Sequence, residues 1–184
     1  NEPEKPNIEI IKTGINQVNV NEEFRYQFDI KNTGNTTLSN CIWYDYLPYE
    51  FIDVRKIETG IYSNDINYDI YCKTNKRGYI KIADRINSKE NLDIHIANIG
   101  LKEDEYITEL KFDFGEVDKD FGSLVSPNII CKVRDENTAD NQEFTNKTKI
   151  IADRKGYSVE SEDEFTIIVN NKKIEVKKLP RTGF

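Results

Sequence analysis

Apolar and polar residues alternate along much of this chain. The clearest run spans residues 23–31, where Phe24, Tyr26, Phe28 and Ile30 alternate with charged or polar residues. Side chains two apart on an extended chain share a face, so this pattern predicts a half-buried β-strand with one face in water. An Asn-Thr-Gly-Asn sequence follows the run and predicts a turn, because Gly and Asn tolerate positive φ.

Comparable runs recur through the rest of the sequence. They span about 38–47, 66–73, 78–83, 92–97, 106–114, 127–134, 144–152 and 163–170. Turn residues separate most of them, and no apolar period of 3.6 residues persists for three turns. Only residues 86–92 fit a short helix. Many short strands without intervening helices predict an all-β fold, an antiparallel β-sandwich.

The two ends of the chain differ from this strand pattern. Residues 1–7 contain two prolines and no apolar side chain, which is typical of an extended linker. Beyond residue 170 a Lys- and Asn-rich stretch fits either a last edge strand or a solvated spacer. We therefore expect a linker over 1–7, one sandwich domain over 8–170, and a spacer with a terminal motif over 171–184.

The composition limits the kinds of binding site and reaction that this chain can support. The 184 residues suffice for a core without metal or disulfide support, and the net charge of −7 excludes a nucleic-acid partner. One histidine and three cysteines without metal-ligand spacing predict neither a metal site nor a cofactor, and most hydrolase triads are excluded, so we expect no enzyme. Cys41 and Cys72 fit either a disulfide or, given the odd count, buried thiols.

Other candidates have simple structural interpretations. The acidic stretches 118–120 and 135–143 lack the spacing of a calcium loop and are interpreted as solvated. Trp43 lies in a predicted strand, where an aromatic side chain is more often core than a sugar-stacking platform. His95 alternates with two isoleucines and is expected to face water.

A short motif near the end of the chain carries the strongest functional signal. It consists of Leu179, Pro180, Arg181, Thr182 and Gly183, the Leu-Pro-x-Thr-Gly pattern that sortase transpeptidases recognise. Proline pre-orders the peptide, and glycine allows close approach to the scissile bond. The motif predicts cleavage between Thr182 and Gly183 and covalent attachment of Thr182 to peptidoglycan or a pilin subunit. Sortase is thus an expected partner.

The same motif implies a location. Sortase substrates are secreted proteins of the Gram-positive cell wall, and in the longer protein a hydrophobic segment and a basic tail are expected to follow the motif.

Five short segments add a family resemblance. They are residues 11–14 (Ile-Lys-Thr-Gly), 18–26 (Val-Asn-Val-Asn-Glu-Glu-Phe-Arg-Tyr), 31–37 (Lys-Asn-Thr-Gly-Asn-Thr-Thr), 45–48 (Asp-Tyr-Leu-Pro) and 144–148 (Phe-Thr-Asn-Lys-Thr). In this order they resemble the surface-repeat β-sandwich called "domain of unknown function eleven", which is similar to the A-type modules of collagen adhesins. The resemblance covers about residues 8–170, with a longer middle over 56–115, and implies an immunoglobulin-like sandwich.

The resemblance also implies an internal cross-link, because such modules often form a Lys–Asn isopeptide bond. Lys12, Asp45 and Asn146 each share strand parity with apolar neighbours and are expected to point inward. A neutral Lys12 amine can attack the Asn146 carboxamide while a protonated Asp45 polarises the carbonyl and shuttles the proton. Two alternatives stay open. Lys12 and Asp45 can form an unreacted ion pair bonded to Asn146, or Lys12 can extend to solvent.

These features predict a structural role. We expect a wall-proximal stalk or pilin-like domain, anchored at Thr182 and stiffened by a Lys12–Asn146 bond. No Tyr-Pro-Lys-Asn pilin motif is present, which argues against a polymerising shaft subunit. The alternative is an adhesin module that binds a host matrix protein or glycan. An adhesin domain should retain binding when isolated, whereas a stalk should not.

Overall fold

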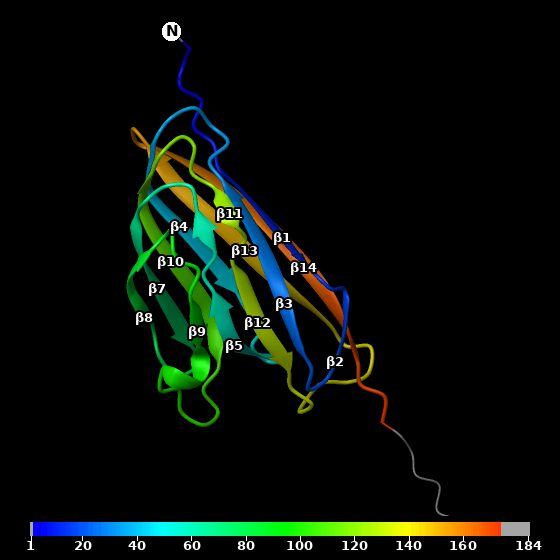
Figure 1. The fold of residues 1–184 in the computed structure, drawn as a ribbon. Helices are drawn as coiled ribbons and strands as arrows, with labels where there is room; N and C mark the ends of the chain where they lie inside the picture. The colour runs from blue at the N-terminus through cyan, green and yellow to red at the C-terminus, as the bar shows by residue number, and fades with distance from the viewer. Residues whose placement is uncertain (1, 174–184) are drawn as a thin grey trace, which may run out of the picture.

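The computed structural model describes residues 2–173 of the chain, so the motif Leu179–Gly183 lies outside the described residues. The described part is a β-sandwich (Figure 1). Its strands are β1 (Glu9–Gly14), β2 (Gln17–Asn19), β3 (Glu23–Lys31), β4 (Leu38–Tyr46), β5 (Ile52–Glu58), β6 (Ile61–Tyr62), β7 (Asn67–Thr74), β8 (Ile80–Asn87), β9 (Asp93–His95), β10 (Ile107–Val117), β11 (Ser123–Val125), β12 (Asn128–Val133), β13 (Glu143–Arg154) and β14 (Tyr157–Asn170).

The strands form two main sheets that face each other. The five-stranded sheet has the order β1-β3-β12-β5-β9, and the seven-stranded sheet has the order β2-β14-β13-β4-β10-β7-β8. A small β11-β6 pair lies beside them. Neighbouring strands are antiparallel except for β2 and β14, which pair in parallel. The all-β antiparallel sandwich predicted from the sequence is therefore confirmed, with one parallel pair added.

Several predicted elements need correction. The strand β5 was not expected, because a register shift in its pairing with β12 breaks the alternation of its buried residues. Residues 86–92 are not helical, since β8 runs to Asn87 and a turn follows. The single helical turn in the described residues, η1 (Ile96–Asn98), falls where the end of a strand was predicted.

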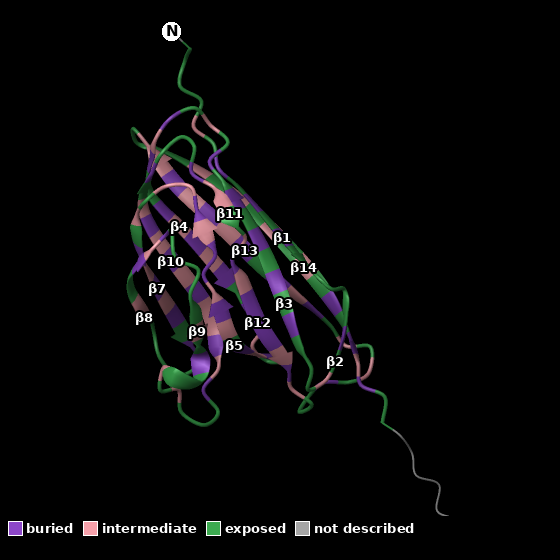
Figure 2. Ribbon diagram, in the orientation of Figure 1, coloured by how far each residue is buried: buried purple, intermediate pink, exposed green. Residues whose placement is uncertain are grey.

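The core lies between the two sheets and follows the sequence alternation (Figure 2). In β3 every second residue is buried, as predicted. Trp43 on β4 is fully buried, with its ring 4.6 Å from Phe28 across the sandwich and 4.0 Å from Phe112 on β10. The interpretation of Trp43 as a core residue is confirmed. All three cysteines are buried free thiols, so the alternative of a Cys41–Cys72 disulfide is wrong.

The two ends of the described chain lie at opposite ends of an elongated domain (Figure 1). At one end, the Lys5 backbone N–H donates to Asn35 Oδ1 at 2.7 Å, and a Cβ at Gly34 would clash with the Lys5 carbonyl. At the other end, the Asn171 backbone N–H donates to Asp140 at 2.8 Å and its side-chain amide donates to the Thr138 carbonyl at 2.6 Å. Hydrogen bonds thus attach both terminal segments to the sandwich.

Candidate cross-linking site

Three polar side chains meet in the core between the sheets. Lys12 comes from β1 in the five-stranded sheet, whereas Asp45 on β4 and Asn146 on β13 come from adjacent strands of the seven-stranded sheet. All three are buried, with Lys12 only 3% exposed and the other two at 0%. Strand parity predicts this inward orientation, because each residue occupies the same face as buried apolar neighbours.

The Asp45 carboxylate contacts both of the other groups. Lys12 Nζ lies 2.9 Å from Asp45 Oδ1, and Asn146 Nδ2 donates to Asp45 Oδ2 at 3.2 Å. One carboxylate therefore bridges the amine and the carboxamide, with one oxygen contacting each. The Lys12 side chain has no exposed surface, so the alternative in which it extends to solvent is wrong.

Aromatic rings and a threonine complete the surroundings of the site. Lys12 Nζ lies 4.0 Å from the ring centroid of Tyr26 and 4.2 Å from that of Phe28, both on β3. The Thr148 hydroxyl accepts a hydrogen bond from Trp43 Nε1 at 2.7 Å. These residues were not among those predicted for the site, although the strict alternation of β3 places both rings on the inner face. The Lys12 amine is consequently buried against two aromatic rings.

This environment favours the neutral forms of the ion pair. Burial lowers the pKa of Lys12, and the nearby Asp45 charge opposes that shift only in part. Burial likewise raises the pKa of Asp45, against the opposing effect of Lys12 and of the hydrogen bond from Asn146. Moving one proton from Lys12 Nζ to the carboxylate that it contacts turns two buried charges into two neutral groups.

One polar atom of the site has no hydrogen-bond partner among the described residues. Asn146 Oδ1 is fully buried, while Asn146 Nδ2 faces Asp45. An unpartnered buried carbonyl oxygen is costly. If Asp45 is protonated, a half-turn of the amide presents Oδ1 to the carboxyl proton and gives this oxygen a donor. The arrangement thus accommodates a hydrogen bond that would polarise the Asn146 carbonyl.

The other candidate residues from the sequence lie outside this buried site. Within residues 2–173, no group of three or more His, Cys, Asp or Glu side chains is placed to hold a metal ion. In the acidic stretch 135–143, Asp135 pairs with Lys173 and also accepts a hydrogen bond from Asn171. His95 is exposed at the end of β9, as expected. No helix in the described part is long and apolar enough to cross a membrane.

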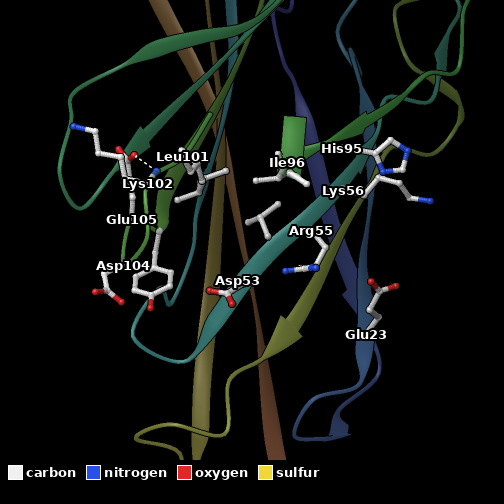
Figure 3. Close-up of a pocket in the computed structure, with 14 residues that line it drawn as sticks. Glu23, Asp53, Arg55, Lys56, His95, Ile96, Leu101, Lys102, Asp104 and Glu105 are labelled. Carbon is white, nitrogen blue, oxygen red and sulfur yellow. Dashed lines mark hydrogen bonds between the residues drawn. The ribbon is translucent and has the colours of Figure 1, made fainter. Parts of the chain in front are cut away.

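A hollow of about 430 Å³ lies between β5 and the segment that leads into β10 (Figure 3). Its lining mixes cationic side chains, among them Arg55 and Lys102, with acidic ones such as Glu23 and Asp104. It shares no lining residue with the Lys12 site. Because the charges of both signs are interspersed, the lining does not select a ligand of one charge.

Comparisons with known proteins give a general structural likeness. The sequence matches no protein-family model and no curated protein. A type I cohesin from Clostridium thermocellum, solved in complex with a dockerin, has a TM-score of 0.48 and 11% identity over 92% of this chain and 98% of that one. The seventh ScaB type I cohesin of Pseudobacteroides cellulosolvens has a TM-score of 0.47 and 14% identity, covering 94% of this chain and 99% of its own.

A pilin gives a similar result. The full-length major pilin SpaD from Corynebacterium diphtheriae has a TM-score of 0.46 and 11% identity over 88% of this chain and 34% of that one. At these sequence identities and TM-scores the likeness concerns only the arrangement of the strands, and no function is inferred from it.

Proposed function

We propose that this chain is a structural stalk domain of a Gram-positive cell-surface protein, stiffened by an isopeptide bond between Lys12 and Asn146. The observation that supports the bond best is the pair of contacts made by Asp45, one to the reacting amine and one to the carboxamide. The cross-link forms within one molecule and once only. The domain is therefore not an enzyme in this proposal.

The reaction needs no co-reactant. Lys12 Nζ transfers one proton to Asp45, and the neutral amine then attacks Cγ of Asn146, whose carbonyl is polarised by the protonated carboxyl. The new Nζ–Cγ bond forms as the Cγ–Nδ2 bond breaks. Asp45 relays a second amine proton to the leaving nitrogen and keeps the proton that it first took from Lys12, so it ends as a neutral carboxyl. One ammonia is released, and the product is a neutral amide between the two sheets.

The cross-link would have a clear mechanical effect. It joins the first strand to the penultimate one and closes residues 12–146 as a loop. In the chain-entropy description, closing a loop of this length stabilises the fold by roughly 5 kcal/mol. Because the two ends of the described chain lie at opposite ends of the domain, tension along its long axis would pass from β1 directly to β13 (Figure 1). The segments between them would be spared extension.

The point of attachment belongs to the same proposal. A secreted protein cut by sortase between Thr182 and Gly183 would be joined through Thr182 to peptidoglycan or to a pilin subunit. The described chain ends with Lys173, and 8 residues separate it from Thr182 (residues 174–181). A domain so close to its anchor bears load that is applied further along the protein.

Two assays test the two parts of the proposal separately. For the bond, protease digestion followed by tandem mass spectrometry should reveal one branched peptide that contains Lys12 and Asn146. The Asn146→Ala variant is the matched control and should yield the two peptides unlinked. Unlinked peptides from the native sequence would refute the bond.

For the anchor, the protein is incubated with a sortase specific for this motif and a glycine-based nucleophile. An adduct should form at Thr182 and disappear in Thr182→Ala. Failure to form it would refute the attachment and leave the cross-link unaffected.

A further inference from the structure

The strand that carries Lys12 is an edge strand with an unusual partner. β1 lies at the edge of the five-stranded sheet and pairs with β3 on one side only, with Lys12 opposite Phe28. On its other side, side chains of β14 take the place of a neighbouring strand, although β14 belongs to the opposite sheet. The Ile10 N–H donates to Ser161 Oγ at 3.2 Å, and the Lys12 N–H donates to Asp163 Oδ2 at 2.8 Å.

Asp163 is itself held in place. Its second oxygen, Oδ1, accepts the backbone N–H of Glu164 at 2.9 Å. Two backbone donors thus fix both oxygens of one carboxylate, and through it the main chain of Lys12. Asp163 also lines a hollow of about 360 Å³ together with Thr148, whose hydroxyl contributes to the buried site. Asp163 therefore links the Lys12 main chain to a solvent-facing hollow of the opposite sheet.

The charges that face Lys12 come from several strands. Asp45 on β4 contacts the amine directly, while Asp163 on β14 contacts the main chain of the same residue. The remaining titratable neighbours are Cys131 on β12 and Tyr26 on β3, and burial raises the pKa of both, so each stays neutral. Among these neighbours in residues 2–173, Asp163 is thus the one charged group besides Asp45, and its negative charge raises the pKa of Lys12 and so favours the ammonium form.

We propose that Asp163 is a positioning residue for the Lys12–Asn146 reaction, holding the Lys12 main chain in register and setting the pH range of the reaction by its charge. This proposal rests on the cross-link proposed above. Two functions of one carboxylate are separable by substitution. Asparagine keeps an oxygen for the Lys12 N–H but has no charge, whereas alanine has neither.

The test follows ammonia loss in the full chain. Protein purified under denaturing conditions from insoluble material is refolded by dilution over a series of pH values, and intact mass is sampled with time. Asp163→Ala should lower the maximal rate of cross-linking roughly tenfold to a hundredfold, because small displacements of a reacting group carry penalties of this size, and should also move the pH profile to lower pH because the charge is lost. Asp163→Asn should retain the native maximal rate, with its pH profile moved to lower pH.

Controls separate this proposal from the one on which it rests. Ser161→Ala removes the neighbouring contact to Ile10 and should change neither rate nor profile. If the native sequence loses no ammonia, the cross-link fails and the role of Asp163 with it. If the native sequence cross-links and both Asp163 variants match its rate and profile, only the role of Asp163 is refuted. The fluorescence of Trp43, the only tryptophan, reports that each variant has folded.

A second readout does not depend on the bond. In an Asn146→Ala background, which cannot cross-link, Asp163→Ala should accelerate hydrogen exchange of the Lys12 amide at least tenfold, while the Ile10 amide changes little. Unchanged exchange at Lys12 would show that Asp163 does not hold the strand, and would overturn the positioning role.

Discussion

Two buried carboxylates in this domain each face a cation, yet they are driven toward opposite protonation states. Asp45 contacts Lys12 and Asn146 in the core, and burial raises its pKa. Glu105, just before β10, contacts Arg77, and its pKa is lowered to about 2. Both side chains have no exposed surface. The two carboxylates differ in location and partner: Asp45 lies in the core beside a buried lysine, whereas Glu105 lies in a turn beside a partly exposed arginine.

The partners of the two carboxylates explain the difference. Arg77 binds Glu105 through two nitrogens, at 2.7 and 3.0 Å, and its own side chain is 39% exposed, so its charge stays hydrated. The Thr74 hydroxyl and the Lys102 backbone N–H add two further donors to Glu105. Asp45 has a cation that is itself enclosed by aromatic rings. A partly exposed arginine stabilises an ion pair, whereas a buried lysine favours proton transfer.

The largest effect is expected from breaking the Asp45 contacts. Asp45→Ala removes the proton acceptor, so the cross-link should not form, and it leaves the Lys12 amine buried without a partner. We expect a loss of roughly 3–5 kcal/mol for the orphaned charge, in addition to the stabilisation by the bond itself. Urea unfolding and intact mass measure both losses. Ammonia release at the native rate in this variant would contradict the role of Asp45.

A somewhat smaller effect should follow from Asn146→Ala, which removes the electrophile and leaves the Lys12–Asp45 pair intact. The loss should approach the loop-closure contribution of roughly 5 kcal/mol, because only the covalent constraint disappears. Comparing its urea midpoint with that of the native sequence isolates the bond. Equal midpoints, with equal dependence on urea, would mean that no covalent constraint exists in the native protein.

The Glu105–Arg77 pair should make the stability of the protein depend on pH. Its folded pKa of about 2 lies below the usual 4.5, so the folded state binds fewer protons than the unfolded one between these values. The stabilisation is fully present above about pH 4.5 and is lost as the pH falls toward about 2. The drop in Tm between about pH 7 and about pH 3 should be smaller in Glu105→Gln than in the native protein. An equal drop in both would assign the acid sensitivity elsewhere.

The smallest effect is expected from Arg77→Lys, which keeps the charge but loses the two-pronged contact with Glu105. Because Arg77 is partly exposed, Tm at neutral pH should fall less than in either variant of the Lys12 site. The acid limb of the pH–stability curve should move to higher pH, since Glu105 would titrate closer to its usual range. A loss as large as that of Asp45→Ala would remove the distinction between the two pairs.

The alternation of apolar and polar residues predicted those strands that have one face in the core and the other in solvent. The bounds of β3 match the predicted 23–31, because its inner residues are uniformly apolar and its outer ones polar. The strand β5 was missed because a bulge interrupts its period. For the site, parity predicted that Lys12, Asp45 and Asn146 point inward, since each shares a face with apolar neighbours. That the three side chains meet depends on how the two sheets face each other, which parity within single strands does not determine.

The contacts to Asp163 and Glu105 could not be predicted from the sequence, for a related reason. Asp163 accepts a hydrogen bond from the backbone N–H of Lys12, which lies 151 residues earlier in the sequence. The pattern of side chains does not indicate which main-chain N–H forms such a contact. Glu105 lies in a turn, where no period of two applies, and its partner Arg77 lies 28 residues earlier in another turn. Such contacts arise only once tertiary structure brings loops and sheets together.

The most direct test of the central claim is the intact mass of the full chain, measured under denaturing and reducing conditions. We expect a native mass one ammonia below the mass calculated from the sequence. Lys12→Ala and Asn146→Ala should each have the full mass calculated from their own sequences. A native mass equal to the full sum would show that Lys12, Asp45 and Asn146 form an unreacted ion pair, and would contradict the covalent stalk.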